Sequence, residues 1–285
     1  MSVYDIDGNI AQGVCKTNRT KAINAYSIGG TQIYALNLKV MEYNVGGWYD
    51  GSGSNVPAAS INTYYNLQAQ TIQDNDPDVM LINEYWSQFS DSGYSALSFL
   101  QQFFPYVYAV PYPDHKSYGR AICAKYPITG YQNHTYTGYS PRYYDSMIMT
   151  INNTEITLVV THLGLTVEER QAEAAQLITY LESLQTPFIC AGDLNTAKTS
   201  TTTADDYVNV IQPLLNAGFH LANMGDFGRL ITYKNTEKGN GALDNIIVSH
   251  NLTIASAYVS TEKETAELPT QIDHMPLVAN VLLTN

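Results

Sequence analysis

The sequence PFICAGDLN, at residues 187–195, decides how the rest of the chain is interpreted. Its apolar residues 188–191 predict a short buried strand, and two polar residues, Asp193 and Asn195, follow that strand directly. A single Asp after a strand is most often a turn former. The pair therefore indicates a functional site only if other strands of the chain also end in polar residues.

Other predicted strands do carry polar side chains at one end. Acids, amides or imidazoles flank five further apolar runs, at residues 35–44, 78–82, 156–161, 245–248 and 276–282. In chain order, these polar side chains are Asn44, Glu84, His162, Asp244, Asp273 and His274. Residues at strand ends can converge on one rim of a sheet, where loops meet and a substrate enters. Independent turn formers would not combine carboxylates, amides and two histidines at so many strand ends.

The order of predicted helices and strands indicates the architecture. Thr166 and Glu169 form a capping box that begins a helix expected at residues 166–184. Further helices are expected at residues 60–75, 95–103 and 207–217, and further strands at 106–110, 119–124 and 145–151. Runs of strands separated by a few helices favour an α/β fold, with two packed sheets and helices outside.

Residues 1–33 differ from the rest of the chain. They are rich in Gly, Asn and Ser and show little hydrophobic periodicity, which predicts an arm or adaptor segment. Residues 34–285 are predicted to form the folded domain. The opening residues 4–9, YDIDGN, resemble short arms on phage tail proteins and on cell-surface proteins of gut bacteria. That resemblance implies attachment to a particle or a cell surface, and the alternative is a flexible leader.

The composition excludes several classes of protein. Of the 285 residues, 45% are hydrophobic, which is enough for a sizeable core. The net charge of −12 argues against a module that binds nucleic acid or anionic membranes by charge alone. The three cysteines lack zinc-site spacing. Neither a signal peptide nor an apolar run of membrane-spanning length is visible, so we expect a soluble protein without membrane contact. The surface is expected to be rich in Tyr, which suits an extracellular or particle-associated location.

Six stretches of the chain resemble motifs of the endonuclease/exonuclease/phosphatase superfamily, whose members share the deoxyribonuclease I-like fold. Each motif alone is weak, but together they occur in the family's order across residues 36–283. The motifs are VMEYN at 40–44, DVMLINE at 78–84, THL at 161–163, GDLN at 192–195, LDNII at 243–247 and DHMPL at 273–277. The resemblance implies a four-layer α/β sandwich, in which two mostly antiparallel sheets pack together and helices cover the outer faces.

The resemblance also implies a hydrolase of phosphate esters that uses a divalent cation. Glu84 corresponds to the main ligand of Mg²⁺, with Mn²⁺ or Ca²⁺ as alternatives, because a carboxylate oxygen suits these hard cations. Asn44 and Asp273 correspond to residues that hold the same cation or its waters. Whether one or two cations act stays open, and with two cations Asp193 becomes a ligand.

The remaining polar residues correspond to the family's catalytic groups. Asp193 resembles the residue that orients or deprotonates the attacking water, and Asn195 resembles an amide that donates to a phosphate oxygen. Asp244 and His274 resemble an acid–imidazole pair, in which the carboxylate fixes the tautomer and favours the charged ring. His162 could donate to the phosphate or protonate the leaving oxygen.

Three positions depart from the family's pattern. Ile272 stands where the family usually has Ser or Thr, so a hydrogen bond to Asp273 is expected to be missing. Gly119 stands where deoxyribonuclease I-like nucleases have an acid that partners the first histidine, so His162 is expected to have a weaker proton relay. Asn83 replaces the more usual Gln.

Nucleic acid, and DNA in particular, is the substrate that the sequence favours. Cations and aromatic side chains alternate near the implied rim, and Arg142, Tyr118 and Arg120 are predicted to bind the substrate. A solvated, Tyr-rich surface explains the same residues about equally well. Three alternatives stay open: a phosphomonoesterase of the family, a lipid phosphodiesterase of the family, and a catalytically silent surface-binding module.

Overall fold

The computed structural model describes residues 24–28, 31–46, 58–87, 95–112, 118–138, 141–196, 204–235, 239–260 and 274–284. The strands of a first sheet are β1 (Asn24–Ile28), β2 (Thr31–Asn44), β3 (Val79–Trp86), β4 (Tyr106–Pro111), β5 (Tyr118–Ala124), β14 (Leu252–Val259) and β15 (Leu277–Thr284). The strands of a second sheet are β6 (Ile128–Thr135), β7 (Tyr143–Ile151), β8 (Thr154–His162), β9 (Phe188–Asp193), β10 (His220–Leu221) and β13 (Asp244–Val248). A small ribbon pairs β11 (Tyr233–Asn235) with β12 (Gly239–Gly241).

The strand order follows the chain only in part. The seven-stranded sheet has the order β14-β15-β2-β3-β5-β4, with β1 paired to β2, and the six-stranded sheet has the order β10-β13-β9-β8-β7-β6. Most neighbours are antiparallel, but β2 runs parallel to β3 and β8 runs parallel to β9. The helical elements are α2 (Ala58–Asn75), α3 (Ala96–Leu100), α4 (Val167–Ser183), the π-helical turn η2 (Tyr207–Ile211) and α6 (Gln212–Asn216).

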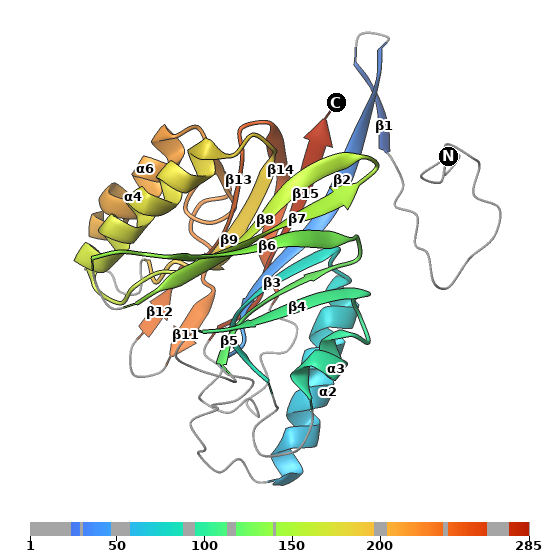
Figure 1. Ribbon diagram of the computed structural model, residues 1–285, viewed down its shortest axis with the longest axis vertical. Coiled ribbons are helices and arrows are strands. Elements are labelled where there is room, and N and C mark those ends of the chain that lie inside the picture. Colours follow the sequence, from blue (N-terminus) through green and yellow to red (C-terminus); the bar gives the residue numbers. More distant parts are fainter. Residues whose placement is uncertain are drawn as a thin grey trace, which may run out of the picture.

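Three apolar layers hold these elements together. Leu81 of the first sheet and Leu158 of the second belong to the layer between the sheets. Ile72 of α2 and Phe99 of α3 pack on the outer face of the first sheet, and Leu177 of α4 packs on the outer face of the second. Figure 1 shows α4 and α6 flanking one sheet and α2 and α3 flanking the other. The predicted four-layer α/β sandwich is therefore confirmed.

The predicted elements of the catalytic region agree with the structure to within a few residues. The capping box is present as predicted, because Thr166 Oγ1 accepts from the backbone N–H of Glu169 and the Glu169 carboxylate accepts from the backbone N–H of Thr166. Sequence analysis missed β6, β14 and the short strands β10, β11 and β12. No helix within the described residues has both the length and the apolar character needed to cross a bilayer.

The structure describes only the last part of the predicted arm of residues 1–33. Residues 24–28 form β1, which pairs antiparallel with residues 31–35 at the start of β2. This hairpin projects beyond the body of the sandwich in Figure 1. Residues 1–23, which include the segment at 4–9, lie outside the described residues.

We expect deletion of residues 1–30 to leave the turnover number within about twofold of wild type, because terminal segments without site residues tolerate truncation. The deleted strand pairs only with residues 31–35, whereas β15 pairs with β2 from Ala35 onward. Steady-state rates of the truncated and full chains on one substrate test this. Loss of soluble protein on truncation would show instead that the hairpin completes the core.

Candidate active site

Two pairs of parallel strands bring the predicted site residues to one edge of the sandwich. Asn44 and Glu84 lie at the carboxyl ends of β2 and β3, and His162 and Asp193 lie at those of β8 and β9. Asp193 pairs in register with His162 on one side and with Asp244 of β13 on the other. Residues paired in register point to the same face, so these three side chains lie together.

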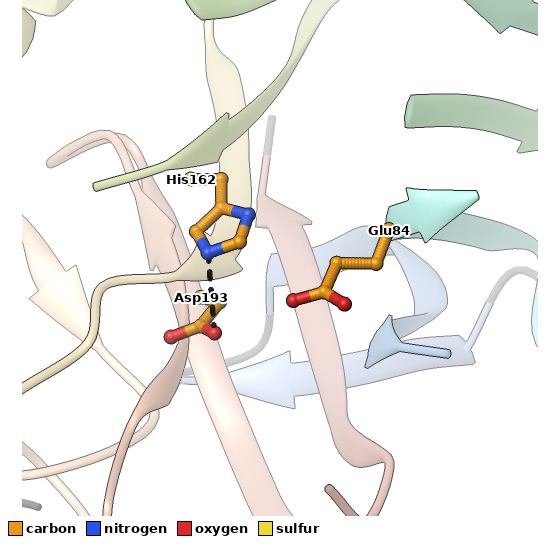
Figure 2. Close-up of side chains that lie close together, drawn as sticks. All are labelled: Glu84, His162 and Asp193. Atoms are coloured by element: carbon orange, nitrogen blue, oxygen red, sulfur yellow. Dashed lines mark ion pairs between the residues drawn. The ribbon is translucent and has the colours of Figure 1, made fainter. Parts of the chain in front are cut away.

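A bulge at the end of β3 aims Glu84 at the same place. The pairing of β3 with β5 shifts register between Ile82 and Tyr85, and Glu84 has a φ of 54°. A left-handed conformation costs on the order of 1–3 kcal/mol for a residue other than Gly, and such strain concentrates at functional sites. Asn44 Nδ2 donates to Glu84 Oε1 at 2.9 Å, and Figure 2 shows the Glu84 carboxylate facing Asp193 and His162.

The side chain of Asp193 connects the two sheets. Its Oδ2 accepts from Asn44 Nδ2 at 3.0 Å, which links the first sheet to the second. Its Oδ1 accepts from the backbone N–H of Asn195 at 2.7 Å. Two imidazoles face the same Oδ2, with His162 Nε2 at 3.5 Å and His274 Nε2 at 3.7 Å. One buried carboxylate therefore faces an amide, a backbone N–H and two imidazoles.

Burial raises the pKa of Asp193 to about 7. The charge of His274 and the backbone N–H of Asn195 oppose this shift, while the negative charges of Asp244 and Glu84 add to it. The carboxyl group can therefore take up or release a proton near neutral pH, as a general base requires.

His274 and Asp244 are in contact, as predicted. His274 Nδ1 lies 2.8 Å from Oδ2 and 3.1 Å from Oδ1 of Asp244, so the Nδ1–H donates to a buried carboxylate. The ring of Tyr233 packs edge-on against the imidazole, with centroids 5.2 Å apart. These contacts fix the ring and leave Nε2 directed toward Asp193.

His162 Nε2 faces Asp193, but its Nδ1 lacks an acid partner among the described residues, which agrees with the predicted departure. Its Nδ1 is buried and forms no hydrogen bond with any described residue. A side chain at Gly119 would be impossible, because an added Cβ would lie 1.8 Å from the carbonyl oxygen of Val110. Burial holds the pKa of His162 well below its usual range, and nearby positive charges add to this effect, in decreasing order those of Arg142, His274 and Arg120. His162 is therefore a neutral donor.

The predicted metal residues are only partly described. Ligand atoms of Glu84, His162 and Asp193 lie within 4.8 Å of one another, and those of Asp193, Asp244 and His274 form a second such group. Asn44 turns its Nδ2 toward the carboxylates, and its Oδ1, the atom that a cation would bind, accepts from the backbone N–H of Gly46. Asp273 and Ile272 lie outside the described residues.

A search of protein-family models gives one decisive match. The model of the Endonuclease/Exonuclease/phosphatase family matches residues 43–265. The chain belongs to this family. Membership supports a hydrolase that acts on phosphate esters, and the family is generally dependent on a divalent metal, which agrees with the acid and histidine groups of the site. Comparison with curated protein sequences finds no match.

Solved structures of the family share the fold. A family protein from Leptotrichia buccalis C-1013-b is 17% identical, with a TM-score of 0.60 over 85% of this chain and 98% of that chain. The family enzyme from Bacteroides vulgatus is also 17% identical, with a TM-score of 0.62 over 87% and 99% of the two chains. TDP2 of D. rerio, solved with a single strand DNA product, is 14% identical, with a TM-score of 0.64 over 86% and 98%.

Two of the predicted substrate-binding residues lie at the family site. Tyr118 is half-buried, and its phenol is hydrogen-bonded to Glu84, so burial and then the charge of Glu84 raise its pKa above the usual range. Arg142 is half-buried too, and its charge acts on both Tyr118 and His162. Among the described residues, the Arg142 guanidinium has no hydrogen-bond or ion-pair partner, which leaves it available to a phosphate.

The third predicted residue, Arg120, lies inside the sandwich. Its side chain is 0% exposed, and its Nε forms an ion pair with Asp145 of β7 across the two sheets. The guanidinium also donates to the carbonyl of Tyr143 and lies 4.7 Å from the ring centre of Tyr112. Arg120 therefore cannot contact a substrate directly, and the prediction of direct contact is wrong.

Sequence analysis missed a buried acid beneath the site. Glu42 is 0% exposed, and its Oε1 accepts from Asn83 Nδ2 at 3.3 Å. Burial, followed by the charges of Asp244 and Asp193, raises its pKa well above the usual range. Glu42 lies two residues before Asn44 on a strand, where side chains alternate, so this spacing was the available signal.

Proposed function

We propose that the chain is a divalent-metal-dependent phosphodiesterase that hydrolyses DNA. The observation that carries this proposal is the convergence of donors and imidazoles on Asp193 at the rim where both sheets meet. A carboxylate whose pKa burial raises to about 7 suits the activation of water at neutral pH. The acids, amide and histidines that meet at the site argue against a catalytically silent module.

The donor set fits a hard divalent cation. Glu84 and Asp193 offer carboxylate oxygens close together, and carboxylates are the ligands that Mg²⁺ and Mn²⁺ prefer. In our proposal Glu84 holds the cation, and Asn44 and Asp273 hold the same cation or its waters. When bound, the cation supplies positive charge that stabilises the negative charge developing on the phosphate oxygens.

The residues of the chain supply proton transfer and hydrogen bonds. Asp193 orients the attacking water and takes its proton. Asn195 donates to a non-bridging phosphate oxygen, and His274, held by Asp244, donates from Nε2 to the developing charge. His162, which is neutral, donates from Nε2 to the phosphate or to the leaving oxygen. Arg142 forms an ion pair with another phosphate of the bound DNA strand.

Two side chains at the rim of the site favour DNA over other phosphate esters as the substrate. The Arg142 guanidinium, which has no partner among the described residues, lies near Tyr118. Together they offer a charge for the phosphate backbone and an aromatic ring for a base, which suits a nucleotide strand. TDP2 of D. rerio, which shares the fold, has been solved with a single strand DNA product. A phosphomonoesterase and a lipid phosphodiesterase stay as outcomes of the test.

A substrate panel tests the proposal. Purified protein is incubated, with Mg²⁺ or with EDTA, with plasmid DNA, single-stranded DNA, RNA, bis-nitrophenyl phosphate, nitrophenyl phosphate and sphingomyelin vesicles. We expect chelator-sensitive cleavage of DNA and of the diester. Cleavage of the monoester or of the lipid alone would redirect the assignment, and no cleavage of any substrate would favour the surface-binding module.

We expect Glu84→Ala to lower the turnover number on DNA by about 10²–10³-fold, because an electrostatic contribution at the reacting phosphate is usually large. The variant should also lose binding of Mn²⁺ measured by calorimetry, which does not depend on turnover. Glu182→Ala, which removes an exposed acid at the end of α4, serves as the matched control. Unchanged Mn²⁺ affinity in Glu84→Ala would contradict the assignment of this ligand.

A further inference from the structure

Helix α4 carries a buried acid that faces the active-site rim. Glu173 is 1% exposed, and its Oε2 accepts from the backbone N–H of Gly164 at 2.6 Å. Its Oε1 has no hydrogen-bond partner among the described residues. Burying a carboxylate is costly unless hydrogen bonds compensate for lost water, so this position calls for an explanation beyond packing.

One peptide group connects this acid to the site. The Gly164 N–H and the Leu163 carbonyl are the two ends of the same planar peptide unit. The Leu163 oxygen accepts from Asn195 Nδ2 at 2.9 Å, and the Leu163 N–H donates to the backbone oxygen of Asp193 at 2.9 Å. A continuous hydrogen-bond chain therefore runs from Glu173, through the peptide, to the side chain of Asn195.

We propose that Glu173 is a positioning residue that orients the Asn195 amide through the 163–164 peptide. The inference rests on the proposed function, in which Asn195 donates to a phosphate oxygen. A carboxylate that accepts from a peptide N–H draws electron density toward the carbonyl of that peptide, and chained hydrogen bonds strengthen one another. The Leu163 oxygen then binds one Nδ2 hydrogen of Asn195 more tightly and directs the other to the substrate.

The backbone at Asn195 needs such support. Its φ of 53° is left-handed, a conformation that costs energy and that surrounding contacts must hold. Two contacts do so, the backbone N–H bond to Asp193 Oδ1 and the side-chain bond to the Leu163 oxygen. The second of these is the one that Glu173 reinforces.

A neighbouring acid on the same helix provides a contrast. Glu169 accepts from the backbone N–H groups of Leu165 and Thr166 and belongs to the capping box, but it has no hydrogen bond to the peptide that holds Asn195. Glu169→Gln therefore changes an acid next to the same segment without touching the proposed connection, and serves as the matched control.

The first test compares two replacements of Glu173 on a DNA oligonucleotide. Glu173→Met keeps the length of the side chain but removes the acceptor, and we expect about a tenfold or greater loss in kcat with KM changed less than twofold, since Asn195 acts in the transition state. Glu173→Gln keeps an acceptor and should restore most of the rate. Wild-type kcat in Glu173→Met, or the same loss in Glu169→Gln, would overturn the proposal.

The second test asks whether the effect passes through Asn195. In the Asn195→Ala background, Glu173→Met should cause no further loss, because residues that act as one unit are not additive. An equal loss in both backgrounds would contradict the connection. If Asn195→Ala itself keeps the wild-type rate, the proposed role of Asn195 in catalysis is wrong. That result differs from an equal loss in both backgrounds, which would contradict only the link between Glu173 and Asn195.

The third test uses pH and does not depend on the Met variant folding. Burial raises the pKa of Glu173 to about 7, with Arg142 and Arg170 opposing the shift and Glu169 adding to it. The charge on Glu173, which strengthens the support of Asn195, is therefore present above pH 7 and lost below, where a neutral acceptor remains. We expect Glu173→Gln to match wild type within about twofold at pH 6 and to be slower at pH 8.5.

The same titration has a readout in the free protein. In metal-free protein labelled with ¹⁵N, the Gly164 backbone amide and the Asn195 side-chain amide should shift together with a midpoint near 7. Glu173→Gln should abolish the Gly164 shift and reduce the Asn195 shift to the part caused by Asp193, which accepts from the Asn195 backbone N–H, whereas Glu169→Gln should keep both shifts. An Asn195 side-chain shift that Glu173→Gln leaves unchanged would contradict the connection through the peptide.

Discussion

The Asp193→Asn variant is expected to hydrolyse DNA at least about 10³-fold more slowly than wild type, because the loss of a general base typically costs 10²–10⁴-fold and Asp193 also faces the proposed cation. Asn has the same shape as Asp but cannot take a proton. Its nitrogen would also meet the Nδ2 donors of Asn44, which now donate to Asp193 Oδ2 at 3.0 Å. The loss should appear in kcat under single-turnover conditions.

The control for this variant is Asp205→Asn, which makes the same chemical change at an exposed acid just before η2. Both variants should give the circular dichroism spectrum of the folded protein. A residual rate above about one tenth of wild type in Asp193→Asn would show that another group activates the water.

The second large effect is expected at the Asp244–His274 pair. His274→Ala should lower kcat by about 10²–10³-fold, the range found when one donor to a developing oxyanion is removed. Asp244→Asn should cause a smaller loss, because the ring remains but is no longer held by a carboxylate 2.8 Å from Nδ1. The double variant should be no slower than His274→Ala alone, since Asp244 acts only through the ring.

An exposed pair offers a matched comparison. His220 Nδ1 lies 3.1 Å from Asp226 Oδ2, the same type of contact, but both side chains are 39% exposed. Asp226→Asn should therefore leave kcat unchanged. Losses in Asp244→Asn and His274→Ala that multiply in the double variant would show that the two residues act independently.

The sequence predicted the elements whose pattern is local. Strand β9 and the residues that follow it were predicted because an apolar run followed by Asp and Asn is visible in nine residues. Strand β6 was missed because it is an edge strand whose residues 132–134 are polar, so it lacks the alternation of a half-buried strand. Strand β1 was missed because the Gly-Gly at residues 29–30, which can mark a hairpin, was interpreted as part of a loop-rich arm.

Contacts between distant residues explain the remaining differences. Arg120 was predicted to bind the substrate because cations and aromatic side chains alternate in that part of the sequence. Its burial depends on Asp145, which lies 25 residues later on the other sheet and has no local signal. Glu173 lies in the helix predicted at residues 166–184, but only the fold brings it against Gly164.

The most direct test of the central claim is the nicking of supercoiled plasmid DNA by purified wild-type and Asp193→Asn protein, each in Mg²⁺ and in EDTA. We predict nicking by the wild type in Mg²⁺ only, and none by the variant under either condition. Equal nicking by both proteins, or nicking that persists in EDTA, would contradict a metal-dependent phosphodiesterase centred on Asp193.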